Sequence, residues 1–156
     1  MDVAEVVRGM KIRKLEELTN FGGTLCHGCF DILHIGHIRH LVRARELAPE
    51  KSLIVTVTAD RYISKGLGRP CFPAEIRAEC LAALACVDYV AIVDEATGLT
   101  AIDVIRPRYY VKGHDYEGRG GIAALEQDRV RQFGGSTIFT DVVYSSSKIL
   151  EQLNGR

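Results

Sequence analysis

The stretch His27-Gly-Cys-Phe-Asp-Ile-Leu-His-Ile-Gly-His37 decides the fold of this chain. A β-rich run over residues 24–29 leads into it, and a helical pattern follows. Gly28 allows a tight turn between the two. His34 and His37 are three residues apart, so both imidazoles can lie on one face of the first helical turn, beside its unbonded N–H groups and the positive end of its dipole. The sequence therefore predicts a strand–helix junction that binds an anion, such as a phosphate under attack.

Outward from this junction, short β-rich runs alternate with helical patterns. We expect strands over 24–29, 52–58, 89–93, 108–112 and 137–140, and helices over 35–47, 73–85, 100–105, 121–133 and 145–153. In the second helix the pattern predicts that Ile76, Leu81 and Leu84 face the core.

The alternation predicts an α/β fold: a Rossmann-like, doubly wound parallel five-stranded sheet with helices on both faces. The run SLIVTVT at 52–58 is apolar on both sides, as a strand covered on both faces must be. We expect a single domain over 1–156, with its motifs between about 23 and 150. Such sheets bind ligands at the carboxyl ends of their strands, near the point where the strand order reverses.

Composition narrows the function classes. The chain has 156 residues, 47% of them apolar and 26% charged, with a formal net charge of zero. Nothing in this balance favours a nucleic-acid partner, and no apolar run approaches the roughly 20 residues of a membrane helix. The stretch MDVAEVVRGMKIRK lacks the apolar core of a signal peptide. We expect a cytoplasmic protein without a membrane or nucleic-acid partner.

Five cysteines include the pair Cys26 and Cys29, spaced as in a redox or zinc-binding CxxC. A redox CxxC has its first thiol at a helix N-terminus, whereas Cys26 ends a predicted strand. A structural zinc site needs a second pair of ligands, which the sequence does not offer. We expect small, packed side chains and reduced thiols.

Four motifs carry a resemblance to a known family. Gly28-Cys-Phe-Asp31 followed by His34-Ile-Gly-His37 is similar to the GxFD…HxGH signature of the cytidylyltransferase-like nucleotidyltransferase superfamily. Residues 65–77 resemble the "KG…RPxxPxExR" stretch of heptose 1-phosphate adenylyltransferases. Residues 111–116 and 144–149 resemble the "VKGxDY" and "STTKI" motifs of these enzymes and of glycerol-phosphate cytidylyltransferases. Class I aminoacyl-tRNA synthetases share the HxGH element but are much larger. His114 and Tyr144 depart from the motifs and leave the acceptor open.

The resemblance implies an enzyme that transfers a nucleoside monophosphate from an NTP to a phosphorylated acceptor and releases pyrophosphate. We expect His34, His37 and Lys65 to be catalytic, as donors to the phosphates. The residues expected to bind the nucleotide are Gly28, Cys29, Phe30, Asp31, Gly36, Lys112, Gly113, Asp115, Ser145, Ser146 and Ser147. Asp31 should accept backbone N–H bonds in its loop rather than act as a base.

Further expectations concern the acceptor and the metal. Arg39, Arg77 and His114 are candidates for contact with the acceptor, although Arg77 could equally brace the loop before its helix. Mg²⁺ is the expected cofactor, held mainly by the nucleotide phosphates because no carboxylate cluster marks a protein-bound site. A homodimer is compatible with the resemblance.

Three functions stay open at this stage. The motifs slightly favour ATP and a sugar 1-phosphate. A cytidylyltransferase that uses CTP and glycerol phosphate, or another capsule or cell-wall precursor, is the alternative. A regulatory module that binds nucleotides without turnover is disfavoured, because both histidines and the serines at 145–147 are intact. A redox domain is disfavoured because no GxGxxG follows a strand.

Overall fold

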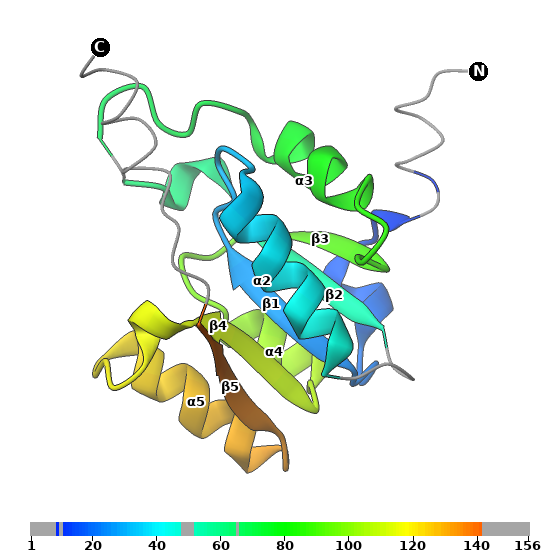
Figure 1. Cartoon of the computed structure of the whole chain (residues 1–156), viewed down its shortest axis with the longest axis vertical. Coiled ribbons are helices and arrows are strands. Elements are labelled where there is room, and N and C mark those ends of the chain that lie inside the picture. Colours follow the sequence, from blue (N-terminus) through cyan, green and yellow to red (C-terminus); the bar gives the residue numbers. More distant parts are fainter. Residues whose placement is uncertain (1–8, 10, 48–51, 65, 142–156) are drawn as a thin grey trace.

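A computed structural model describes residues 9, 11–47, 52–64 and 66–141. Its five strands form one parallel sheet in the order β3-β2-β1-β4-β5 (Figure 1). The strands are β1 (Thr24–Gly28), β2 (Leu53–Thr58), β3 (Tyr89–Val93), β4 (Tyr109–Gly113) and β5 (Ser136–Thr140). The helices are α2 (Ile35–Glu46), α3 (Ala74–Ala82), α4 (Leu99–Ile105) and α5 (Ile122–Gln132), with 3₁₀ turns η1 (Leu15–Leu18), η2 (Asp60–Tyr62) and η3 (His114–Tyr116).

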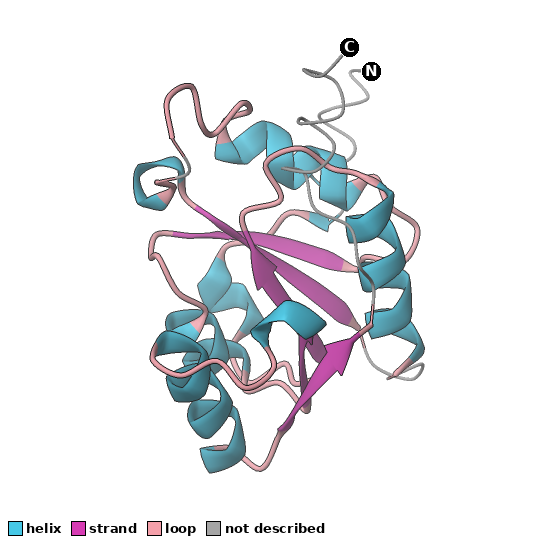
Figure 2. Cartoon of the chain, turned by 60° about the vertical axis from the view of Figure 1, so that its left-hand side comes forward, coloured by secondary structure: helices cyan, strands magenta, loops and turns pink. Residues whose placement is uncertain are grey.

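Helices lie on opposite faces of the sheet (Figure 2). Two apolar layers hold them there. Successive strand residues point to opposite faces. Cys26 and Val55 therefore pack with α2 and α3, whereas their neighbours Leu25 and Ile54 pack with α4, α5 and η1. Each fully buried aliphatic side chain contributes roughly 1.5–3 kcal/mol. The predicted doubly wound sheet is confirmed.

The strand order reverses between β1 and β4. β1 and β2 pair in register from Thr24↔Leu53 to Gly28↔Val57, but β1 and β4 pair only at Thr24↔Tyr109 and Leu25↔Tyr110. The ladder between β1 and β4 thus stops before the carboxyl ends of both strands. Parallel sheets of this class bind ligands at such a place.

Predicted boundaries differ from the observed ones by at most three residues, and most in α3. This helix begins at Ala74 after Pro73, and it ends at Ala82 because Leu84 turns back to bond the Leu81 carbonyl. The prediction that Ile76 faces the core is wrong, since it is 38% exposed and Arg77 and Ala78 are buried instead. The predicted helix over 145–153 lies outside the described residues. Within the described ranges, no helix is long and apolar enough to cross a membrane.

Candidate functional site

The turn after β1 brings Phe30 under the first turn of α2. Phe30 has φ +48° and is buried, with its ring 5.2 Å from that of His37 in an edge-to-face contact. A Cβ at Gly28 would lie 3.2 Å from the Phe30 ring, so the glycine permits this close approach. Within the GxFD motif, Gly28 thus permits the turn, and Phe30 packs against the first turn of α2.

His34 and His37 lie together at the N-terminus of α2, as predicted. Their rings stack with centroids 3.8 Å apart. His34 is the N-cap residue, and its Nδ1 accepts a 3.1 Å hydrogen bond from the N–H of Gly36. An accepting Nδ1 carries no proton, and burial lowers the pKa of His34. The neutral ring therefore carries its proton on Nε2, which can donate to a phosphate oxygen.

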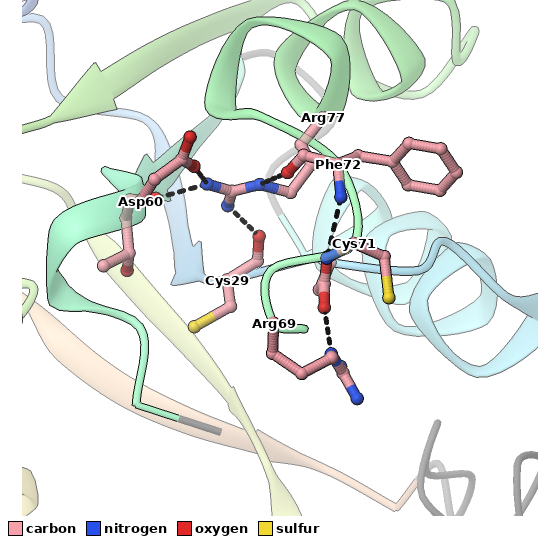
Figure 3. Close-up of polar contacts among 8 residues, drawn as sticks. Cys29, Asp60, Arg69, Cys71, Phe72 and Arg77 are labelled. Carbon is pink, nitrogen blue, oxygen red and sulfur yellow. Dashed lines mark hydrogen bonds and ion pairs between the residues drawn. The ribbon is translucent and has the colours of Figure 1, made fainter. Parts of the chain in front are cut away.

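Asp31 organises the loop that crosses from β2 to α3. Its buried carboxylate accepts the N–H groups of Cys71 at 2.7 Å and Phe72 at 3.3 Å, and pairs with the Arg69 guanidinium (Figure 3). Burial raises the pKa of Asp31, but these hydrogen bonds outweigh it and hold the pKa below its usual value. Asp31 thus accepts backbone N–H bonds, as expected, but from the loop before α3 and not from its own loop.

Arg77 braces the loops after β1 and β2 and is not placed to bind an acceptor. Its side chain is buried, and all three guanidinium nitrogens donate to the protein (Figure 3). Nε bonds the Phe72 carbonyl at 2.9 Å, and one terminal nitrogen bonds the Cys29 carbonyl at 2.5 Å. The other bonds the Thr58 carbonyl at 2.9 Å and Asp60 at 2.5 Å. The suggested acceptor role of Arg77 is therefore corrected to a bracing one.

The other predicted residues fall into three groups. Lys112 is buried at the end of β4, and Gly113 follows it, where a Cβ would meet Asp115 at 2.7 Å. Asp115 and His114 are exposed on η3 and pair with Arg119 at 3.4 Å and Glu117 at 2.8 Å, respectively. Arg39 is exposed on α2. The predicted Lys65, Ser145, Ser146 and Ser147 lie outside the described residues.

The cysteines and carboxylates show no metal or redox centre in the part of the chain that the structure describes. All five cysteines are free thiols. Burial raises the pKa of Cys26 to about 12, so its thiol stays protonated and unreactive. No group of three or more His, Cys, Asp or Glu among the described residues could hold a metal ion.

A buried polar cluster near the carboxyl end of β4 joins Lys112 to three residues that the sequence did not mark as functional, Glu126, Gly98 and Tyr110. Glu126 of α5 accepts the N–H of Gly98 at 2.7 Å and the hydroxyl of Tyr110 at 3.0 Å. Its carboxylate lies 3.6 Å from the Lys112 ammonium. The cluster is tight, since a Cβ at Gly98 would lie 2.5 Å from the Tyr110 oxygen. The one signal in the sequence is that Glu126 precedes the buried Val130 by four residues, on the same face of a helix.

Two histidines beside this cluster, the buried His27 and the partly buried His40, are neutral. His27 bonds the hydroxyls of Thr56 at 3.0 Å and Thr58 at 3.3 Å, and burial together with the Lys112 charge lowers its pKa to about 3. His40 bonds the Thr140 hydroxyl at 2.7 Å, and the same two causes lower its pKa to about 4. Neither ring supplies a positive charge near neutral pH.

Comparison with known proteins places the chain in a family. The family model described as cytidylyltransferase-like matches residues 25–127. The bifunctional protein HldE of Syntrophotalea carbinolica is 39% identical over 134 residues, which are 83% of this chain and 26% of that protein. HldE of Koribacter versatilis is 40% identical over 130 residues, which are 81% of this chain and 26% of that protein. The chain thus spans about a quarter of the length of these relatives.

Solved structures share the fold. The lipopolysaccharide core biosynthesis protein of Thermoplasma volcanium superposes with a TM-score of 0.60 at 24% identity, covering 80% of this chain and 98% of that one. Pantothenate synthetase of Thermus thermophilus superposes with a TM-score of 0.55 at 18% identity, covering 84% of this chain and 61% of that one. Both likenesses concern the fold.

The lowered pKa of His40 predicts a loss of stability in acid. The unfolded chain takes up a proton on this histidine below its ordinary pKa of about 6.5, whereas the folded protein resists protonation until about pH 4. Stability must therefore fall as the pH drops through this window. His40→Asn removes the titrating ring. Between pH 7 and 4.5 its free energy of unfolding should therefore fall by about 2 kcal/mol less than that of the wild type.

Urea denaturation at the two pH values measures this difference, with His114→Asn on the exposed η3 turn as the matched control. His27 remains in the variant, so part of the acid loss should persist. Equal losses for the wild type and His40→Asn would contradict the prediction.

Proposed function

Because the chain belongs to the cytidylyltransferase-like family and is a nucleotidyltransferase, we propose that it transfers a nucleoside monophosphate from an NTP to a phosphorylated small molecule, with release of pyrophosphate. The observation that carries this proposal is the stacked pair His34 and His37 at the N-terminus of α2, beside the reversal of strand order. Helix N-termini favour phosphate, and the reversal point is where such sheets bind ligands.

The chemistry asks the protein to position two anions and to stabilise charge in the transition state. A phosphate oxygen of the acceptor attacks the α-phosphorus and forms a new P–O bond. The bond from the α-phosphorus to the bridging oxygen breaks, and pyrophosphate leaves with both electrons. Nε2–H of His34 donates to the developing negative charge, and no covalent intermediate with the protein is needed.

The positions that hold the triphosphate complete the proposal. Lys65 and the serines at 145–147 are proposed phosphate ligands by resemblance, although they lie outside the described residues. Mg²⁺ is the proposed cofactor; when bound to the triphosphate it neutralises negative charge. Since no cluster of three metal-ligating side chains occurs in the described part of the chain, the phosphates would supply most of its ligands.

We propose ATP as donor and a sugar 1-phosphate as acceptor, because the motifs at 65–77 and 111–116 resemble those of heptose 1-phosphate adenylyltransferases and the HldE relatives are about 40% identical. CTP with glycerol phosphate or another precursor is the second candidate, favoured by the resemblance of residues 111–116 to the glycerol-phosphate enzymes. The exposed His114 would then contribute to the choice of acceptor. The proposal includes action in the cytoplasm, where the five free thiols stay reduced, and action as a homodimer.

Pyrophosphate release tests the proposal directly. The purified protein is incubated with Mg²⁺, each of the four NTPs, and a panel of heptose and hexose 1-phosphates, glycerol 3-phosphate, phosphocholine, phosphoethanolamine and phosphopantetheine. Release that requires one NTP and one acceptor supports the reaction and identifies both substrates. Nucleotide binding without release for any pair would favour the regulatory module instead.

Replacing His34 separates its chemical role from its structural role as the N-cap residue of α2. Asparagine is a strong N-cap residue, so His34→Asn should preserve the start of α2 while removing the Nε2 donor. We expect kcat to fall by about 10²–10³-fold with an unchanged melting temperature. Asp128→Asn, on the exposed side of α5, is the control and should leave kcat unchanged. Near-normal kcat in folded His34→Asn would show that this ring does not stabilise the transition state.

A further inference from the structure

We propose that Glu126 is a positioning residue for Lys112, and that this pair recognises an uncharged polar part of the substrate, the base or the ribose, rather than its phosphates. The inference rests on the proposed function and deepens it. It assigns a role to a helix, α5, whose sequence resembles none of the quoted motifs.

The geometry holds Lys112 in one place. Its side chain is only 10% exposed, and its ammonium lies 4.5 Å from the centre of the Tyr116 ring and 5.3 Å from that of Tyr110. Glu126, 5% exposed, lies on the α5 side of the ammonium. Because the same carboxylate also bonds the Gly98 N–H and the Tyr110 hydroxyl, it cannot turn away from this position without breaking two hydrogen bonds.

Lys112 has hydrogen-bonding capacity left over. An ammonium carries three donors. In the described part of the chain it donates one long hydrogen bond, to the His27 carbonyl at 3.4 Å, where about 2.9 Å is usual. The Glu126 carboxylate at 3.6 Å is an ion-pair partner beyond hydrogen-bond distance. A buried ammonium with only one long hydrogen bond is costly unless a further hydrogen-bond acceptor completes its shell. The His27 carbonyl lies where the β1–β4 ladder has already stopped, so the ammonium lies at the reversal point.

The charges around the Lys112 ammonium decide which hydrogen-bond acceptor of the substrate fits there. Lys112 and Glu126 together are neutral, and the neighbouring His27 and His40 are uncharged near neutral pH. Asp115 on η3 adds a negative charge that is shared with Arg119. A phosphate at the ammonium would meet the Glu126 carboxylate as well, whereas a hydroxyl or ring nitrogen takes the hydrogen bond without that repulsion. The histidine pair at α2 is a separate place for the phosphates.

Glu126→Gln tests both parts of the inference. Glutamine keeps a carbonyl for the Gly98 N–H but turns an amide donor toward the ammonium, which displaces Lys112 and removes its counter-charge. The nucleotide used is whichever of Mg·ATP and Mg·CTP binds the wild type more tightly. We expect its dissociation constant to rise about tenfold. Binding of inorganic triphosphate with Mg²⁺, measured in the same calorimeter, should be unchanged or tighter. The matched control is Asp128→Asn, which removes the same charge from the exposed side of α5 and should change neither constant.

A double-mutant cycle with Lys112→Met separates positioning from mere support of the fold. If Glu126 acts through Lys112, adding Glu126→Gln to Lys112→Met should change nucleotide affinity by less than about twofold. A second tenfold loss would mean that Glu126 acts independently of Lys112 and would overturn the inference. The double variant removes both buried charges. If Glu126→Gln alone does not fold, nucleotide binding and triphosphate binding are compared in the double variant instead.

Two outcomes overturn the inference while leaving the proposed function intact. One is an unchanged nucleotide affinity in Glu126→Gln. The other is a loss of triphosphate binding as large as the loss of nucleotide binding, which would place phosphates at Lys112. Failure of the wild type to bind any nucleotide or to release pyrophosphate would instead overturn the proposed function.

Discussion

The buried guanidinium of Arg77 is the interaction on which the arrangement of the site depends. It ties helix α3 to the backbone just after β1 and at the end of β2, through the carbonyls of Cys29 and Thr58 (Figure 3). Asp31, two residues after Cys29, then holds the N–H groups of the segment that enters α3. A buried charge without partners costs several kcal/mol, so each of these groups keeps the others in place. The turn that carries Phe30 and the histidine pair rests on this frame.

A second set of buried charges lies on the other side of the strand reversal. Lys112 and Glu126 connect β4 to α5, and the Gly98 N–H extends the set to the start of α4. The two sets lie on the two sides of a ladder that stops after two residue pairs. On one side of the ladder, the dipole of α2 supplies positive charge. On the other side, Glu126 cancels the positive charge of Lys112. The two halves of a nucleotide, one highly charged and one neutral, differ in the same way.

Much of the fold could be predicted because its signals are local. Alternating strands and helices, and strands apolar on both faces such as β2, specify the layers without any knowledge of long-range contacts. The histidine pair could be predicted because helical spacing alone brings residues 34 and 37 together. For Asp31 only the kind of bond could be predicted, because its partners Cys71 and Phe72 lie about 40 residues away in another loop.

The rest could not be predicted because it depends on contacts between distant segments. Arg77 lies on a helix whose apolar Ile76 seemed the better core residue by pattern, and only the loop carbonyls around it make its burial favourable. Glu126 likewise looks like a solvated residue of a polar helix until Gly98 and Tyr110 are brought to it. Charged residues are rarely buried, so sequence patterns assign them to the surface unless their partners are known.

The most direct test of the account is an amide chemical-shift titration of the isotope-labelled protein with Mg·ATP and Mg·CTP. The account predicts that the largest shift changes occur in residues 28–37 and 112–116, on the two sides of the strand reversal. Changes centred on the outer faces of α4 and α5, or no changes with either nucleotide, would contradict it.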